Sequence, residues 1–402
     1  MNGYDVAAVR AHFPALKEGA AHFDGPGGTQ TPDTVAAAVS DAMTSAVANR
    51  GTVTAAERRA ESIVAAARVA MAELLGLDPG EIVFGRSATE LTFMVARTLA
   101  AGWGPGDEVV VTRLDHDANV RPWVLAAESV GATVRWASFH PSTGELAVDD
   151  VAAVVGPRTR LVAVTAASNL IGTRPDVPAL ASVAHEVGAQ LYVDGVHATA
   201  HVPTDVPASG ADFWVCSPYK FLGPHLGVLG ARPSILAPLR PWKLVPSTDS
   251  VPERFELGTL PYELLAGTTA AVDFLADLAA VESAATRRDR LVSSFEAIEA
   301  YEDTMLGWLE PRIRALPGVT VYSNARRRTP TLLFTSAHVP AQAIRAALAQ
   351  RGVNAPAGSF YAWEPSHHLG LGAEGGVRVG LAPYSDQSDV ERLIDGLIAV
   401  LT

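Results

Sequence analysis

QLYVDGVHATAHVPTDVPASGADFWVCSPYKFLGPHLGVLGAR, residues 190–232, contains three short apolar runs that are followed at once by polar or small residues. The runs QLYVDG, DFWVCS and GVLGA are continuously hydrophobic, which is typical of strands buried on both faces of a mostly parallel sheet. Only a short loop separates the last two runs, which leaves room for one of them to run antiparallel. The stretch therefore predicts neighbouring strands, with Asp194 at the end of one and Lys220 in the loop after another.

The same pattern of short apolar runs extends upstream to about residue 81. Four further apolar runs begin at residues 82, 108, 133 and 159 and read IVFG, EVVVTRL, TVRWASF and TRLVAVTAAS. Helical patterns occupy 88–101, 119–130, 148–155 and 177–187, between most of these runs. Repeated strand–helix–strand order predicts right-handed crossovers and a three-layer α/β/α domain with a mostly parallel sheet.

After Thr259 the chain changes to alanine- and leucine-rich helical stretches up to about residue 316. A compact tail follows, with VTVYS and TLLFTS as expected strands and 340–351 as a helix. We therefore predict a large domain over 15–260 and a smaller α/β domain over 261–402 that includes residues 1–14.

Composition excludes several classes of protein. The chain has 402 residues, of which 48% are hydrophobic and 18% charged, with a formal net charge of −12. No basic run is present, so we expect no nucleic-acid or membrane partner. Neither a signal peptide nor a membrane-length apolar stretch is visible, and the single cysteine, Cys216, excludes an internal disulfide. We therefore expect a cytoplasmic location.

Polar side chains stand where the apolar runs end, which in open α/β sheets is the ligand-binding edge. Lys220 is one of only three lysines. A lysine at the mouth of a buried strand either reaches solvent with its ammonium group or forms a Schiff base to a carbonyl cofactor, and this segment alone leaves both open. Asp194 either caps the turn before Gly195 or pairs with a protonated pyridine nitrogen and makes the ring an electron sink.

Three further strand ends add groups that suit the same cofactor. Ser87, Ala88 and Thr89 open a helix, where they form an ordinary N-cap or a phosphate site. His116, in LDHDAN, can stack on a ring, and Asn169, in SNLIG, offers an amide. Together the five strand ends provide the parts of a pyridoxal-5′-phosphate (PLP) site.

Ordered motifs along nearly the whole chain resemble the class V aminotransferase and cysteine desulfurase family, in particular its cysteine-desulfurase-like branch. They are FDGPGGTQTP, NRGTVTAAERR, GRSATE, LDHDANVRPW, SNLIGT, YVDGVHA, CSPYKFLGPHLG, FELGT and VRVGLAPYS. The resemblance implies fold type I, the aspartate-aminotransferase-like fold of PLP enzymes. It implies a homodimer in which Thr259 reaches the phosphate of the neighbouring subunit's cofactor. It also implies that Arg378 grips the substrate α-carboxylate, a role that suits the planar fork of a guanidinium.

By motif position the resemblance also implies the cofactor contacts. Lys220 forms the Schiff base, Asp194 faces the pyridine nitrogen, His116 stacks on the ring, Asn169 lies near the ring hydroxyl, and Thr89 and Ser217 bind the phosphate. We add Ser87, Ala88, His197 and Tyr219 to the cofactor-binding set. Lys220, Asp194 and His116 form the predicted catalytic set.

Three departures from the family pattern bear on the reaction. Tyr219 replaces a histidine before the lysine, and His197 replaces a glutamine. The loop that carries the persulfide-forming cysteine in desulfurases reads NAPAGSFYAWEP here, with Tyr361 nearest that position, where we expect it to contact the substrate. Cys216 lies inside an apolar run and is expected to be an inert core thiol.

We therefore expect a PLP enzyme that acts at Cα and Cβ of an amino acid, first as a C–S lyase by β-elimination. Transamination and epimerisation remain alternatives, and a PLP-fold sensor or inactive homologue is the non-enzymatic one. Three rival motifs are rejected: a GxGxxG match at 370–375 precedes a strand, His197 and His201 lack the glutamate of HExxH, and SxxK at 217–220 lacks its helix. No metal site is expected.

Overall fold

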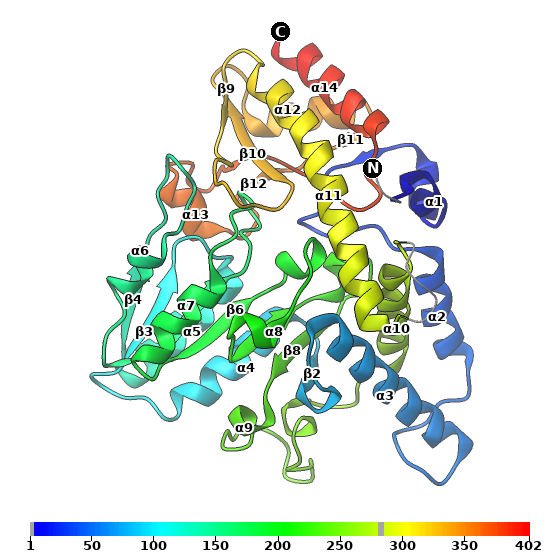
Figure 1. Ribbon diagram of the computed structural model, residues 1–402, viewed down its shortest axis with the longest axis vertical. Helices are drawn as coiled ribbons and strands as arrows, with labels where there is room; N and C mark the ends of the chain where they lie inside the picture. Colours follow the sequence, from blue (N-terminus) through cyan, green and yellow to red (C-terminus); the bar gives the residue numbers. More distant parts are fainter. Residues whose placement is uncertain (1–3, 280–284) are drawn as a thin grey trace.

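The computed structural model describes residues 4–279 and 285–402, and its largest sheet has seven strands (Figure 1). The predicted helical stretch before residue 316 includes 280–284, which lie outside the described residues. The strand order in the sheet is β2-β8-β7-β6-β5-β3-β4. These strands are β2 (Ile82–Gly85), β3 (Glu108–Thr112), β4 (Thr133–Ala137), β5 (Thr159–Thr165), β6 (Gln190–Asp194), β7 (Phe213–Cys216) and β8 (Gly227–Ala231).

The strand directions follow the connections. β3, β4, β5, β6 and β7 pair in parallel, whereas β8 is antiparallel to both β7 and β2. The expectation that one of the last two runs can turn back is thus confirmed, because the short loop after β7 allows no crossover helix. β4 differs from the continuous burial expected of it: it is an edge strand on which exposed and half-buried residues alternate.

Helices cover both faces of this sheet, and α11 (Arg287–Arg314) runs from beside it toward the smaller C-terminal sheet described below (Figure 1). The predicted helices at 88–101 and 177–187 form with bounds shifted by a single residue at the C-terminal end, and those at 119–130 and 148–155 are shorter than predicted. The helices are α1 (Val6–Ala11), α2 (Asp33–Thr44), α3 (Ala55–Leu75), α4 (Ala88–Ala100), α5 (Arg121–Val130), α6 (Val148–Ala152), α7 (Val177–Glu186), α8 (Val206–Ser209), α9 (Pro233–Leu236), α10 (Tyr262–Ala276), α11 (Arg287–Arg314), α12 (Ala341–Ala349), α13 (Trp363–His368) and α14 (Gln387–Leu401). The predicted three-layer α/β architecture is confirmed.

A second, antiparallel sheet forms near the C-terminus, with strand order β12-β13-β10-β9, and a parallel pair of β1 and β11 lies beside it. Its strands are β9 (Val319–Val321), β10 (Thr331–Ser336), β12 (Ala357–Gly358) and β13 (Gly376–Gly380), and the pair is β1 (Ala21–His22) with β11 (Val353–Asn354). The hydrophobic cluster of this unit includes Ala21 and Phe23 from the N-terminal part of the chain. Leu265 of α10 and Phe295 of α11 belong instead to a cluster of the large sheet. The division of the chain after residue 260 stays a prediction.

Within 4–279 and 285–402, no helix is both long enough and apolar enough to cross a bilayer.

Candidate active site

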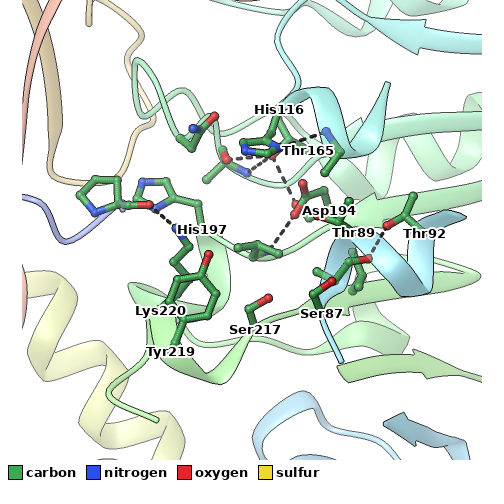
Figure 2. A pocket seen from close by; sticks show the side chains of 17 residues that line it. Ser87, Thr89, Thr92, His116, Thr165, Asp194, His197, Ser217, Tyr219 and Lys220 are labelled. Carbon is green, nitrogen blue, oxygen red and sulfur yellow. Dashed lines mark hydrogen bonds between the residues drawn. The ribbon is translucent and has the colours of Figure 1, made fainter. Parts of the chain in front are cut away.

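One cavity opens beyond the carboxyl ends of the parallel strands, where strand ends, a helix N-terminus and the loop after β7 meet (Figure 2). Every residue in the predicted cofactor-binding set except Thr259 lines it. The lining comprises Pro26, Ser87, Ala88, Thr89, Thr92, His116, Ala118, Thr165, Ala167, Asn169, Asp194, Val196, His197, Val215, Ser217, Tyr219 and Lys220. The sheet therefore assembles the predicted groups because its parallel strands end at one edge.

Lys220 ends the short 3-10 helix Pro218–Lys220, and its side chain points into the cavity (Figure 2). Its Nζ donates to the carbonyl oxygens of Pro26 at 2.6 Å and Gly27 at 2.9 Å. Burial, together with the nearby positive charge of Arg378, lowers the pKa of Lys220 to about 7. A substantial fraction of this amine is therefore neutral near pH 7, and a neutral amine is the form that attacks a carbonyl.

Asp194 is the last residue of β6 and is 7% exposed. Its Oδ1 accepts a hydrogen bond from the backbone N–H of Val196 at 2.9 Å, which fixes the carboxylate in the cavity lining. Burial raises the pKa of Asp194 to about 6, although the Val196 N–H and the Lys220 charge both favour the ionised form. A buried carboxylate of this kind gains from a cationic partner in the cavity.

The N-terminus of α4 forms one wall of the cavity. Ser87 is the N-cap, and its Oγ accepts a hydrogen bond from the backbone N–H of Glu90 at 3.1 Å. The N–H groups of Ala88 and Thr89 have no preceding helical turn to bond, so they and the helix dipole suit an anion. Gly227 lets β8 lie close to the N-terminus of α4, because a Cβ at this position would lie 2.3 Å from the Ser87 carbonyl carbon.

His116 and Asn169 add an imidazole and an amide to the cavity lining. His116 Nδ1 accepts from the backbone N–H of Ala118 at 3.0 Å, so the ring proton is on Nε2. Burial and the Lys220 charge lower the pKa of His116 to about 4, and the ring is therefore neutral. Asn169 Nδ2 donates to the carbonyl of Phe360 at 3.0 Å, while its Oδ1 is buried with no partner among the described residues.

His197 lines the cavity and is held by two threonine hydroxyls at the start of β10. Its Nε2 contacts the hydroxyls of Thr329 at 2.8 Å and Thr331 at 3.1 Å. Its Nδ1 is buried with no partner in the part of the chain that the structure describes. Burial and the neighbouring His201 hold the pKa of His197 well below its usual range, so this imidazole is neutral and offers one free nitrogen.

Arg378, predicted to bind the substrate carboxylate, lies on β13 next to the cavity but not in its lining. It is 2% exposed and donates to Asp24 Oδ1 at 2.6 Å and to the Asn169 carbonyl at 3.1 Å. Its guanidinium carbon lies 3.8 Å from the centroid of the Phe360 ring. Asp24 thus occupies the guanidinium as a substrate carboxylate would, a contact that the sequence did not reveal.

Two further predicted residues lie outside the cavity lining. Tyr361 is 79% exposed, with its ring centroid 5.7 Å from that of His116. Thr259 lies in a separate crevice, where its carbonyl accepts a hydrogen bond from Arg86 at 3.4 Å. Within one chain Thr259 therefore does not reach the cavity, and its assignment to a neighbouring subunit's site stays a prediction.

The other reactive groups near the cavity are buried in the core. Cys216 of β7 is fully buried, and this burial raises the pKa of its thiol far above the usual range. His201 pairs with Glu302 at 2.8 Å in the interior. Among residues 4–279 and 285–402 no group of three or more His, Cys, Asp or Glu side chains could hold a metal ion.

Sequence reasoning missed the carbonyls that hold Lys220 and the acidic partner of Arg378. Pro26, Gly27 and Asp24 all belong to the motif FDGPGGTQTP, which was recognised as a family motif without any role assigned to its residues. Its dense glycine and proline content was the available signal, since such segments form tight loops at binding sites.

The residues present fit PLP. A lysine with a lowered pKa and a buried carboxylate face one cavity. Two buried polar atoms, Asn169 Oδ1 and His197 Nδ1, lack partners among the described residues. Unsatisfied buried polar atoms are costly unless a ligand completes them. A helix N-terminus with Thr89 and Ser217 beside it provides the anion site that a phosphate needs.

Comparison with known proteins agrees with this assignment of a PLP site. The model of the family described as aminotransferase class-V matches residues 21–393. A cysteine desulfurase of Klebsiella pneumoniae is 30% identical over 415 residues, which cover 98% of each chain. An uncharacterized protein of Mycobacterium tuberculosis is 35% identical over 400 residues, 99% of each chain. The crystal structure of the cysteine desulfurase CsdA from Escherichia coli matches all of both chains with a TM-score of 0.88 at 28% identity.

Proposed function

Because this chain belongs to the class V aminotransferase family of PLP-dependent enzymes, we propose that it is a C–S lyase that eliminates sulfur from a cysteine-type amino acid. The family, its cysteine-desulfurase-like character and the PLP cofactor are taken from the comparisons, and the elimination reaction is what we propose in addition. The observation that carries the proposal is the loop at the cavity mouth, residues 359–361, which contacts Asn169 and His116 and contains no thiol.

In this proposal the residues of the cavity divide the work of holding the cofactor. Lys220 binds it covalently, the N-terminus of α4 with Thr89 and Ser217 holds the phosphate, and His116 covers the ring. Asp194 keeps the ring nitrogen protonated, a role that its buried, otherwise unneutralised carboxylate supports. When bound, PLP withdraws electrons from Cα of the amino acid, which makes the Cα proton acidic.

Lys220 and Arg378 then act on the substrate. Arg378 exchanges Asp24 for the substrate carboxylate and so orients Cα. The amino group of the substrate would replace Lys220 on the cofactor and so free the Lys220 amine. This amine, whose pKa burial lowers to about 7, would then accept the Cα proton through its lone pair while its N–H groups donate to the carbonyls of Pro26 and Gly27. The electron pair of the Cα–H bond forms the Cα–Cβ double bond, and the Cβ–S bond breaks with its pair on sulfur. The proton held by Lys220 would pass to the sulfur, and one water would hydrolyse the remaining enamine to pyruvate and ammonia. The products are thus thiol, pyruvate and ammonia, with no net oxidation or reduction.

Transfer of the sulfur to an enzyme thiol would require a thiolate that can reach the substrate. The chain has one cysteine, and Cys216 is fully buried within β7 with its pKa raised. We therefore propose that sulfur leaves as free thiol or sulfide.

We further propose a homodimer in which Thr259 completes the phosphate site of the partner. Arg86, which donates to the Thr259 carbonyl, directly precedes the N-cap Ser87 of α4, so the crevice of Thr259 adjoins the anion site. Mixed dimers of Thr259→Ala and Lys220→Ala chains test this arrangement. One intact site per dimer is expected only if Thr259 acts across the interface.

The reaction is tested by incubating the purified PLP-loaded protein with a panel of amino acids and measuring pyruvate, ammonia, sulfide, thiols and other keto acids. Equimolar pyruvate and thiol from a cysteine-type substrate support the lyase. A keto acid that retains the substrate side chain would identify a transaminase instead, and protein-bound persulfide would identify a desulfurase.

A further inference from the structure

The loop segment Ser359, Phe360 and Tyr361, which we call the strap, has an unusual backbone at the mouth of the cavity. Phe360 and Tyr361 have φ values of 56° and 57°, a left-handed conformation that bulky residues rarely adopt. The Phe360 carbonyl accepts from Asn169 Nδ2 at 3.0 Å, and the Tyr361 carbonyl accepts from the Asp117 N–H at 2.8 Å. The strap is therefore fixed to the cavity wall at two adjacent carbonyls.

This backbone sends the two aromatic side chains to different places. The Phe360 ring packs on the Arg378 guanidinium, with 3.8 Å between the guanidinium carbon and the ring centroid. The Tyr361 ring stays 79% exposed and lies 5.7 Å from the His116 ring at 30°. A large aromatic face thus stands open to solvent beside a residue of the cavity wall, where a bound molecule can cover it.

Four charged side chains, three from the segment around His116 and one shortly after the strap in sequence, are paired with one another. Arg113 contacts Glu364 at 2.7 Å, and Arg121 contacts Asp117 at 3.1 Å and Glu364 at 3.7 Å. Their charges are therefore already compensated within this group of four. The surface that the strap offers to a substituent of the substrate is aromatic and not a free charge.

We propose that Tyr361 is a specificity-determining residue and that the substrates are cysteine S-conjugates with an uncharged aromatic or similarly apolar substituent on sulfur. This inference rests on the proposed C–S elimination. The substrate carboxylate at Arg378 and Cα at Lys220 leave the sulfur substituent to extend toward the cavity mouth, where Tyr361 stacks on it. The released product is the corresponding thiol, with pyruvate and ammonia formed as in the elimination above.

The kinetic test compares S-benzyl-cysteine, S-carboxymethyl-cysteine and free cysteine as substrates of the PLP-loaded enzyme. The benzyl conjugate is expected to have a kcat/KM about tenfold or more above the other two. Tyr361→Asn, which suits the left-handed backbone, is expected to remove that preference, and Tyr361→Phe to keep it. Trp363→Ala, which removes a half-exposed aromatic outside the cavity lining, is the matched control and should keep it as well. Equal turnover of cysteine and the benzyl conjugate, or an unchanged preference in Tyr361→Asn, overturns the inference.

A binding measurement separates this inference from the proposed reaction. Benzylthiopropionate carries the carboxylate and the substituent but lacks the amino group, so it cannot react. Calorimetric titration of the PLP-loaded protein should show binding about tenfold tighter than for propionate, with the difference lost in Tyr361→Asn. If this difference is found but no amino acid yields pyruvate, the lyase proposal fails and the assignment of Tyr361 stands. Elimination without any such difference refutes the assignment alone.

Discussion

Replacing Asp194 with asparagine should stabilise the cofactor-free protein while it removes most of the activity. The substitution keeps the shape of the side chain and an oxygen that can accept from the Val196 N–H. It removes a carboxylate that is 7% exposed and whose pKa is raised from 3.8 to about 6, chiefly by burial. The folded protein therefore binds this proton more tightly than the unfolded chain does.

The magnitude follows from that shift. Above about pH 6 both states carry the charged carboxylate, and its burial costs about 3 kcal/mol of folding free energy, since one pKa unit corresponds to about 1.36 kcal/mol. Below about pH 4 both states are protonated and the cost vanishes. As the pH rises from 5 to 8, the free energy of unfolding of the wild type should thus fall by about 1.4 kcal/mol relative to that of Asp194→Asn. The Lys220 amine adds to this difference in the same direction, because Asp194 helps to raise the Lys220 pKa.

The assay is urea unfolding of the cofactor-free wild type and Asp194→Asn at pH 5, 6.5 and 8, with turnover measured on the PLP-loaded proteins. Turnover should fall by about 100-fold to 1,000-fold, the usual effect of removing one group that stabilises transition-state charge. A difference in unfolding free energy that does not grow with pH would refute the assignment of Asp194 as a buried carboxylate with a raised pKa. Near-normal turnover would refute its role at the cofactor.

Three further substitutions test separate parts of the site. Arg378→Ala should raise KM by about 100-fold with a smaller change in kcat, because the substrate carboxylate loses a charged bidentate partner; an unchanged KM would contradict its role. Cys216→Ala should keep activity within about threefold and cost about 1 kcal/mol of stability, and persulfide-trapping mass spectrometry should find no adduct on the wild-type thiol. Gly227→Ala should weaken PLP binding by about tenfold or more, because its Cβ would lie 2.3 Å from the Ser87 carbonyl carbon at the α4 N-terminus. Gly104→Ala, with nothing within 4 Å of the added Cβ, is its control, and equal PLP affinity in both would contradict the packing argument.

The large sheet and the groups at its edge could be predicted because they depend on local signals. Continuous apolar runs mark buried parallel strands, and the polar residue after each run must then lie at the common edge. These signals alone place Asp194 and Lys220 at that edge. The antiparallel direction of β8 was visible only as a loop too short for a crossover.

Contacts between distant parts of the chain could not be predicted from such signals. The Asp24–Arg378 pair joins residues 354 positions apart, and the Pro26 carbonyl meets Lys220 across 194 positions. Neither contact leaves a periodicity or spacing in the sequence. The left-handed backbone of Phe360 and Tyr361 could not be predicted either, because this conformation is normally adopted by glycine or asparagine and not by bulky aromatic residues. Tertiary hydrogen bonds to Asn169 and Asp117 impose it.

Borohydride reduction of the PLP-loaded protein, followed by peptide mapping, tests most directly whether Lys220 holds the cofactor. The chain offers only Lys17, Lys220 and Lys243 as side-chain attachment points, so the outcome is unambiguous. Lys220 alone lines the cavity, and burial with the charge of Arg378 lowers its pKa to about 7, whereas Lys243 pairs with Asp249 at 3.2 Å. The reduced pyridoxyl label is expected on the peptide that contains Lys220 and should be absent from Lys220→Ala. Label on Lys17 or Lys243, or a protein that takes up no PLP, would contradict the account.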